Sequence, residues 1–342
     1  MIKLAINGFG RIGRIAFRQA LLDFKDEIEV VAINTSGSME PEGWATLLKY
    51  DSVYRTFPKE VKVAEAQGSR EIGSLLVEGE LYPLLAEREP LKIPWFAYEP
   101  EVVIESTGAF RKAEEAEKHL KAGAPKVIIS APPKGEGVPI FLMGVNEGRY
   151  KRERIISNGS CTTNCVAPIV KLVKEKFGIE QAALTTIHAY TADQELVDGS
   201  HKDLRRARAA AQNVIPTETG AAESVIAIFP DLKGKFAGSS IRVPVICGSY
   251  SDLTFKVQKK ATINDLNSLF QKAAEGRMKG ILAVTSDPIV SGDIIGNPAS
   301  SIVDLNMTTV VADDFIQVGA WYDNEWAYAK RLLEEAIYIA EK

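Results

Sequence analysis

The stretch that decides the fold is Ile2-Lys3-Leu4-Ala5-Ile6-Asn7-Gly8-Phe9-Gly10-Arg11-Ile12-Gly13, followed directly by the helical stretch 14–24. Its apolar beginning predicts a strand, and its three glycines stand where that strand turns into a helix. In this order one glycine makes a tight turn, the next lets the backbone approach a pyrophosphate, and the third packs helix on strand. The helix start then offers N–H donors and a positive dipole to phosphate. The stretch therefore predicts a dinucleotide site, with candidate residues Gly8, Gly10, Arg11, Ile12 and Gly13.

Outward from this stretch, short apolar runs alternate with helix-period segments as far as about Val145. That alternation predicts a parallel sheet wrapped by helices, which is a Rossmann dinucleotide-binding domain. Paired β-rich pieces around Gly79-Glu80 predict a hairpin inserted into the pattern. The expected strands are Lys3–Asn7, Glu29–Asn34, Val102–Ser106, Val127–Ser130 and Phe141–Val145.

In the second half of the chain the strand patterns are longer. They predict an α+β catalytic domain built on a mainly antiparallel sheet. At 342 residues the chain is long enough for two domains. We predict a dinucleotide-binding domain over residues 1–160, joined by a C-terminal helix at 325–342, and a catalytic domain over 161–324. The expected elements are a helix at Val166–Phe177, strands at Ala183–Ala189, Asp252–Val257, Ser301–Asn306 and Phe315–Trp321, and a helix at Glu325–Ala340.

Composition narrows the class of protein. The formal net charge is −4, so neither nucleic acid nor a membrane surface is expected as a partner. No run approaches the roughly 20 apolar residues that span a bilayer, and three cysteines cannot form a disulfide framework. The N-terminus enters a strand at once, without the pattern of a signal peptide. These features predict a cytoplasmic protein.

The end of the second strand bears on cofactor choice. NAD-selective sites usually carry a carboxylate there for the ribose 2′-hydroxyl, whereas this chain reads Ile33-Asn34-Thr35-Ser36-Gly37-Ser38. The hydroxyl groups of Thr35, Ser36 and Ser38 are candidate donors to a 2′-phosphate. Alternatively, Asn34 and Thr35 satisfy the adenosine hydroxyls of NAD, and no arginine stands beside them to clamp a phosphate. Both NAD and NADP therefore remain candidate cofactors, and we expect the site to accept NADP.

Cys161 is the candidate nucleophile. It stands in Ser157-Asn158-Gly159-Ser160-Cys161-Thr162-Thr163-Asn164-Cys165, which runs into a helical stretch. The N–H groups and dipole of a helix start favour thiolate over thiol, and they also receive a developing oxyanion. Cys165 and Cys247 are assigned to packing, because a zinc site wants four ligands and the chain offers no such set. We therefore expect no metal.

His188 is the candidate base for that thiol. It closes the strand-like run Leu184–Ala189, where a side chain can project into a cleft, and a neutral imidazole there would take the thiol proton. A lone histidine at a strand end is more often structural. Neither of the other two suits a buried base, because His119 lies in a charged helical run and His201 in a polar loop.

Six motifs in one order resemble the glyceraldehyde-3-phosphate dehydrogenase family over essentially the whole chain. Six motifs in the family's order identify the family far more specifically than any one glycine pattern does. They are Ala5–Arg14, Lys49–Ser52, Glu105–Gly108, Ser160–Cys165, Thr186–Thr191 and Trp321–Trp326.

The resemblance implies a function and a set of site residues. It implies phosphorylating oxidation of D-glyceraldehyde 3-phosphate by NAD(P) in glycolysis or gluconeogenesis, through a thioester on Cys161 with His188 as base, in a homotetramer. Asn324 would hold the nicotinamide carboxamide. The remaining cofactor positions would be Asn34, Thr35, Thr107, Gly108, Ser130 and Ser200; the positions for the substrate's phosphate would be Thr191, Arg242 and Asp193; and those for inorganic phosphate would be Ser160, Thr162, Thr219, Gly220 and Arg206.

Departures from the family pattern and competing interpretations remain. NAD-type members of the family carry Asp at the position of Thr35 and often Pro at that of Ser200, so both residues favour NADP acceptance. In the family the Ser200 loop reaches a neighbouring subunit's cofactor pocket. Taken alone, Arg206 in its charged run reads as solvated surface. The alternative activities are erythrose-4-phosphate dehydrogenase and, against the acidic balance, a nucleic-acid or protein-binding role.

Overall fold

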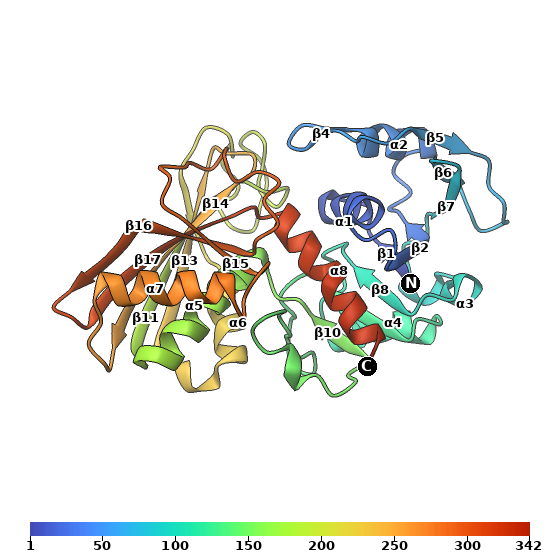
Figure 1. Ribbon diagram of the computed structural model, residues 1–342. Coiled ribbons are helices and arrows are strands. Elements are labelled where there is room, and N and C mark those ends of the chain that lie inside the picture. Colours follow the sequence, from blue (N-terminus) through green and yellow to red (C-terminus); the bar gives the residue numbers. More distant parts are fainter. The chain divides into compact units, whose positions relative to one another are not determined.

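The computed structural model describes residues 1–342, which divide into two compact units (Figure 1). The first comprises residues 1–142, 147–159 and 329–342, and the second comprises residues 143–146 and 160–328. Compared with the expected boundaries, Ser160 falls in the second unit, and the chain returns to the first unit at Ala329 rather than at Glu325.

An eight-stranded sheet in the order β10-β9-β8-β1-β2-β7-β6-β5 forms the first unit. Neighbouring strands from β10 to β7 run parallel, whereas β6 pairs antiparallel with β7 and β5. Leu4, Ala5 and Ile6 of the central strand are fully buried, as a parallel strand covered on both faces requires. The predicted Rossmann fold is confirmed. The strands are β1 (Ile2–Asn7), β2 (Ile28–Asn34), β5 (Val61–Ala64), β6 (Gly73–Val77), β7 (Glu80–Leu85), β8 (Val102–Glu105), β9 (Lys126–Ile129) and β10 (Ile155–Ser157).

Two details of this sheet bear on the expectations. The hairpin predicted around Gly79-Glu80 is present as β6 and β7, and because β7 pairs with β2 it extends the sheet. The strand predicted at Phe141–Val145 is wrong. Ile140 makes only an isolated bridge to Ser157, and Gly144 has a φ of +77°, which interrupts extended backbone. Strand β10, which was not predicted, takes the edge position instead.

Helices flank the sheet of the first unit, and the C-terminal helix α8 (Trp326–Ala340) contributes most of its length. The expected apolar positions of α8, including Leu332, Leu333 and Ala336, are fully buried. None of the helices in the structure has both the length and the apolar character needed to cross a membrane. The other elements here are α1 (Arg11–Leu22), α2 (Pro41–Lys49), α3 (Trp95–Tyr98), α4 (Ala113–Lys121), the short 3-10 turns η1 (Pro90–Lys92) and η2 (Glu147–Arg149), and the two-stranded β3 (Tyr50–Asp51) and β4 (Arg55–Thr56).

The second unit is a seven-stranded sheet in the order β12-β13-β11-β14-β17-β16-β15, with helices on one face (Figure 1). Only the β11–β13 and β15–β16 pairs are parallel, so the prediction of a mainly antiparallel sheet is confirmed. Its elements are α5 (Cys161–Phe177), β11 (Ile179–Ala189), β12 (Ile215–Thr217), α6 (Ala221–Ile228), η3 (Pro230–Leu232), β13 (Phe236–Val243), β14 (Ser249–Val257), α7 (Ile263–Glu275), β15 (Leu282–Thr285), β16 (Ser301–Val311) and β17 (Phe315–Tyr322).

Candidate active site

The glycine turn at the start of α1 has room for a pyrophosphate. Gly8 has a φ of +97°, and a Cβ at Gly13 would lie 2.0 Å from the Gly8 carbonyl oxygen, so both positions demand glycine. At Gly10, the residue before α1, a Cβ would meet nothing within 4 Å, and no side chain caps the helix start. The first-turn N–H groups are thus left for a ligand, and the residues present fit the phosphates of a dinucleotide. Arg11 is used otherwise, because its guanidinium pairs with Asp51.

Polar side chains gather where β1, β2 and β8 end, because the parallel register places Asn7 beside both Asn34 and Glu105. The Asn34 amide donates to Asn7 Oδ1 at 2.7 Å and accepts from the Glu87 N–H at 2.9 Å. Its side chain therefore ties the strand ends together. Thr107 likewise donates its N–H to the Glu105 carboxylate at 2.8 Å.

Thr35 differs from its expected part as a phosphate donor. Its side chain is buried, and its hydroxyl donates to the Leu85 carbonyl oxygen at 2.9 Å. The neighbouring Ser36 and Ser38 are exposed, with their hydroxyl groups 2.8 Å apart. An arginine does lie beside this segment, contrary to expectation, because Arg88 Nε donates to the Ser36 carbonyl oxygen at 3.2 Å. Arg88 lies 52 residues away in sequence and arrives through the β2–β7 pairing.

Two further expected cofactor positions of the first unit lie at strand ends. Gly108 follows the Glu105 turn with a φ of +74°, which favours glycine. Ser130 directly follows β9, and its N–H donates to the Glu105 carbonyl oxygen at 2.9 Å.

Cys161 is the first residue of α5 and is partly exposed. Ser160 caps the helix: its Oγ accepts from the Thr163 N–H at 3.0 Å, and its own N–H donates to Thr163 Oγ1. The hydroxyl of Ser160 is therefore committed to the helix start. Because the cap fixes the first turn, it also fixes the direction of the Cys161 side chain.

His188 lies beside that thiol. Its Nε2 is 3.4 Å from Cys161 Sγ, and its Nδ1 is 2.6 Å from the Ala189 carbonyl oxygen. A proton on Nδ1, accepted by that carbonyl, leaves the Nε2 lone pair facing the sulfur, which is the tautomer a general base needs. Arg242 completes the group, since the β11–β13 register sets it opposite His188 and its Nη1 donates to the same Ala189 carbonyl oxygen at 3.2 Å.

The surroundings of Cys161 and His188 keep both of these groups neutral at rest. Burial, reinforced by the positive charges of Arg242 and Arg206, lowers the pKa of His188 to about 3. Burial also raises the pKa of the Cys161 thiol, against the opposing effects of Arg242 and the Thr162 N–H. The expected stabilisation of thiolate at the helix start is therefore present but outweighed by desolvation. Neutral thiol and neutral imidazole face each other at rest.

A second arginine cluster lies close by in the same unit. Arg206 pairs with Asp193 and donates from Nε to Thr217 Oγ1 at 2.9 Å, and its side chain is only 19% exposed. It is therefore not a solvated surface charge. Thr219 and Gly220 stand at the start of α6, where Thr219 Oγ1 accepts from the Ala221 N–H at 3.2 Å. Thr191 follows β11, and its N–H donates to Gln194 Oε1 at 3.3 Å.

Tyr322 holds the two halves of the Cys161–His188 pair together, a part that the sequence did not reveal. Its hydroxyl lies 2.8 Å from both Thr162 Oγ1 and Thr186 Oγ1, and so it links the start of α5 to β11. Its ring also stands edge-on to that of His188. The hydroxyl of Thr162 is thus engaged inside the protein.

Asn324 and Ser200 complete the expected residues of the second unit. Asn324 follows β17 and is buried, with its Oδ1 accepting from the Gly248 N–H at 3.1 Å. Ser200 is exposed on the long loop between β11 and β12.

His119 has a structural environment in the first unit. His119 lies in a charged helical run as expected, yet it is fully buried, with Trp95 Nε1 donating to its Nδ1 at 3.0 Å and Glu105 Oε2 3.1 Å from its Nε2. Both ring nitrogens are occupied by structural partners. The helix turns this one polar residue inward beside Ala116, three positions earlier.

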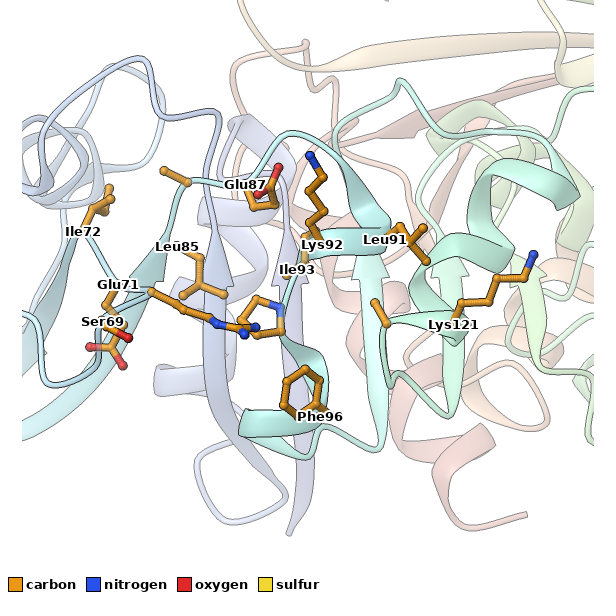
Figure 2. Close-up of a pocket in the computed structure, with 14 residues that line it drawn as sticks. Ser69, Glu71, Ile72, Leu85, Glu87, Leu91, Lys92, Ile93, Phe96 and Lys121 are labelled. Atoms are coloured by element: carbon orange, nitrogen blue, oxygen red, sulfur yellow. The ribbon is translucent and has the colours of Figure 1, made fainter.

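Two cavities lie apart from the expected site residues. A cavity of about 720 Å³ in the first unit is open between Lys92 and Lys121, with Phe96 below (Figure 2). A cavity of about 580 Å³ in the second unit has a mainly apolar lining that includes Tyr250, Met307 and Trp321. Neither cavity is lined by a residue that the sequence assigned to cofactor or substrate.

Comparison with known proteins gives one consistent result. Residues 2–113 match the glyceraldehyde 3-phosphate dehydrogenase NAD-binding domain, and residues 160–324 match the C-terminal domain of the same family. Glyceraldehyde-3-phosphate dehydrogenase 2 of Streptomyces avermitilis is 47% identical over 343 residues, covering 100% of this chain and 99% of that protein. Glyceraldehyde-3-phosphate dehydrogenase of Priestia megaterium is 48% identical over 345 residues, covering 100% of this chain and 99% of that protein. The chloroplastic GAPB enzyme of Arabidopsis thaliana is 48% identical over 345 residues, covering 100% and 75%.

Proposed function

The chain belongs to the glyceraldehyde-3-phosphate dehydrogenase family and is an NAD(P)-dependent phosphorylating oxidoreductase; from this premise we propose that Cys161 carries the reaction as a thioester and His188 is its base. The observation that supports these roles most strongly is the 3.4 Å separation of Cys161 Sγ and His188 Nε2 in a site where both groups are neutral at rest. The substrate aldehyde is glyceraldehyde 3-phosphate, as the relatives' names indicate.

The first step is proton transfer coupled to attack. As the Cys161 sulfur bonds to the aldehyde carbon, its proton moves to His188 Nε2, so no free thiolate has to accumulate in a desolvated site. The carbonyl oxygen gains the electron pair, and the backbone N–H groups at the start of α5 and the new imidazolium stabilise it. Arg242 disfavours a lasting charge on His188, which therefore passes the proton on to the hemithioacetal oxygen and becomes neutral again.

The oxidation step forms the thioester. The bound nicotinamide supplies the hydride acceptor. Asn324 orients it through the carboxamide, and His188 accepts the hydroxyl proton as the carbon–oxygen double bond re-forms. Inorganic phosphate then attacks the thioester carbon, Cys161 leaves as the sulfur anion, and the product is the acyl phosphate 1,3-bisphosphoglycerate.

Two cationic positions suit the two phosphates. Arg242 is partly buried next to His188, and its positive charge acts on Cys161. Together with Thr191 it is proposed to hold the phosphate of the substrate. Arg206, with Thr219 and the start of α6 at Gly220, is proposed to hold the attacking phosphate, while Asp193 keeps the Arg206 guanidinium in place. Ser160 and Thr162 line the thiol but have their hydroxyl groups engaged.

We propose that the cofactor site accepts NADP as well as NAD. No carboxylate ends β2, the exposed hydroxyl groups of Ser36 and Ser38 offer donors, and the Arg88 guanidinium lies against Ser36. Thr35 contributes chiefly by lacking charge, since its hydroxyl is already bonded to Leu85. Ser200 would reach this pocket only from a neighbouring subunit, as the family resemblance implies.

Kinetics with both cofactors test this proposal. We expect Thr35→Asp to lower kcat/KM for NADP by about tenfold or more through repulsion of the 2′-phosphate, and to leave kcat/KM for NAD within about twofold. Arg88→Met should weaken NADP more than NAD. Equal rejection of NADP by wild type and Thr35→Asp would overturn the proposal.

A homotetramer in the cytoplasm is proposed as the working form. The loop between β11 and β12 exposes apolar side chains that a lone subunit would not be expected to leave in water, namely Leu196, Val197, Leu204 and Val214. The mainly apolar cavity of the second unit, whose lining includes Met307 and Trp321, is a further apolar surface of this unit. A reducing compartment suits an enzyme whose three cysteines are all free. Light scattering at micromolar concentration should give four times the mass of one chain, and a monomeric mass would contradict this assignment.

The activity itself is tested by product analysis. The protein with NAD(P) and phosphate should convert glyceraldehyde 3-phosphate to an acyl phosphate, with much weaker turnover of erythrose 4-phosphate. Omission of phosphate should stop turnover after one cycle. Equal or better kcat/KM for erythrose 4-phosphate, or phosphate-independent release of the free acid, would overturn the assigned substrate and reaction.

A further inference from the structure

The carboxamide of Asn324 is held in one of its two orientations. Its Oδ1 accepts from the Gly248 N–H at 3.1 Å and from Ser249 Oγ at 2.9 Å. A backbone N–H can only donate, so the oxygen rather than the amine must face this segment. The Nδ2 amine makes no hydrogen bond within the protein, which leaves two donors for a ligand.

Ser249 sets the direction of the hydrogen bond to Asn324. Its Oγ accepts from the Ala189 N–H at 3.1 Å, which directs the serine's own proton toward Asn324 Oδ1. Ala189 directly follows His188, and its carbonyl oxygen lies 2.6 Å from His188 Nδ1. One hydroxyl group thus joins the backbone beside the base to the side chain beyond β17. Ser249 is 1% exposed, so no solvent competes for these bonds.

The orientation of the Asn324 amide matters for hydride transfer, because its expected partner, the nicotinamide carboxamide, is also an amide. The nicotinamide carboxamide offers one acceptor and one donor, so its binding geometry depends on whether Asn324 presents its amine or its oxygen. A half-turn of the ring about the glycosidic bond moves the carboxamide to the other side and presents the opposite face of the ring. An Asn324 amide free to flip loses the feature that distinguishes these two poses.

We propose that Ser249 is a positioning residue that locks the Asn324 amide and thereby decides which face of the nicotinamide ring receives hydride. This inference rests on the proposed function, because it assumes that Asn324 holds the nicotinamide. Ser249 itself touches neither the reacting atoms nor the cofactor.

The test uses glyceraldehyde 3-phosphate deuterated at its aldehyde carbon, with proton NMR of the reduced cofactor to read which C4 position holds deuterium. Wild type should place deuterium on one face. Ser249→Ala should reduce that facial discrimination by about tenfold and raise the dissociation constant of the oxidised cofactor by a similar factor, with kcat changing less than KM. If the alanine variant is too unstable to purify, Ser249→Cys keeps the shape with a weaker donor and should shift both readouts the same way.

Ser240→Ala is the matched control, because Ser240 is a buried serine of the same sheet whose hydroxyl has no partner. It should keep wild-type facial selectivity and affinity. Retention of single-face transfer and wild-type cofactor affinity in Ser249→Ala would overturn the inference while leaving the enzyme's function standing. Absence of hydride transfer in wild type would instead overturn the function.

Discussion

Two buried histidines, one in each unit, have opposite surroundings. His119 receives a hydrogen bond from Trp95 and lies against the Glu105 carboxylate, so each ring nitrogen has a complementary partner. His188 is buried to nearly the same degree but faces the Arg242 guanidinium and the Cys161 thiol. No carboxylate compensates its protonation. Burial alone therefore does not make a histidine structural or reactive; the charge and the hydrogen-bonding capacity of its neighbours do.

The largest difference between the two should come from removing the His188 ring. We expect His188→Asn to lower kcat/KM by roughly 10³-fold, since it removes the proton acceptor for Cys161. Its free energy of unfolding should not fall, because the ring lies beside a cation. Steady-state kinetics and urea unfolding check both values. Activity within tenfold of wild type would show that another group takes the proton.

The reverse outcome is expected at His119. His119→Leu leaves the Trp95 N–H and one Glu105 oxygen without this partner, and should cost about 2 to 4 kcal/mol of unfolding free energy. His119→Gln, which keeps a donor toward Glu105, should cost less. Turnover of the folded leucine variant at saturating cofactor should stay within about threefold of wild type. Loss of the chemical step in a fully folded variant would contradict a structural role.

The pH dependence of stability should separate them further. Below pH 6.5 the unfolded chain binds a proton at His188, whereas the folded chain does not until about pH 3. The unfolding free energy therefore falls as pH is lowered, by about 1.4 kcal/mol per pH unit from this group. His188→Asn should lack this contribution, so its urea-unfolding curve should fall less steeply between pH 7 and 5. Parallel curves for the two proteins would contradict the depressed pKa.

The smallest effect is expected at Arg242. Its charge lowers the pKa of both Cys161 and His188, so Arg242→Met should raise both. The rate of Cys161 alkylation by iodoacetamide at pH 7 should fall roughly tenfold, which corresponds to about one pKa unit, and the pH profile should move upward. Arg242→Lys should change it less. An unchanged profile in the methionine variant would rule out this electrostatic role.

Local patterns made the principal residues predictable. A few consecutive residues determine each of three elements, and the backbone geometry follows from them. These elements are the glycine turn, the helix that begins at Cys161 and the strand that carries His188 near its end. The burial of His119 was not predicted, because its neighbours are charged, although its spacing of three from Ala116 places both on the inner face of α4. The apolar run Phe141–Val145 misled because a left-handed glycine interrupts it.

The residues that were missed depend on pairings between distant strands. Arg88 reaches Ser36 because β7 pairs with β2, and Ser249 reaches Asn324 because the β14–β17 register sets it opposite Tyr322. Tyr322 itself was part of a recognised motif, but its two threonine partners lie 136 and 160 residues away. The spacing of residues along a single sequence does not reveal such contacts. Only the folded register brings them together.

Detection of a covalent intermediate on Cys161 is the most direct test of the proposed mechanism. The protein is mixed with glyceraldehyde 3-phosphate and oxidised cofactor without phosphate, quenched in acid, and analysed by peptide mass spectrometry. We expect one reduced cofactor per active site and an acyl group on the peptide that contains Cys161, lost on addition of phosphate as acyl phosphate appears. Cofactor reduction with an unmodified Cys161, or an equal burst in Cys161→Ser, would contradict it.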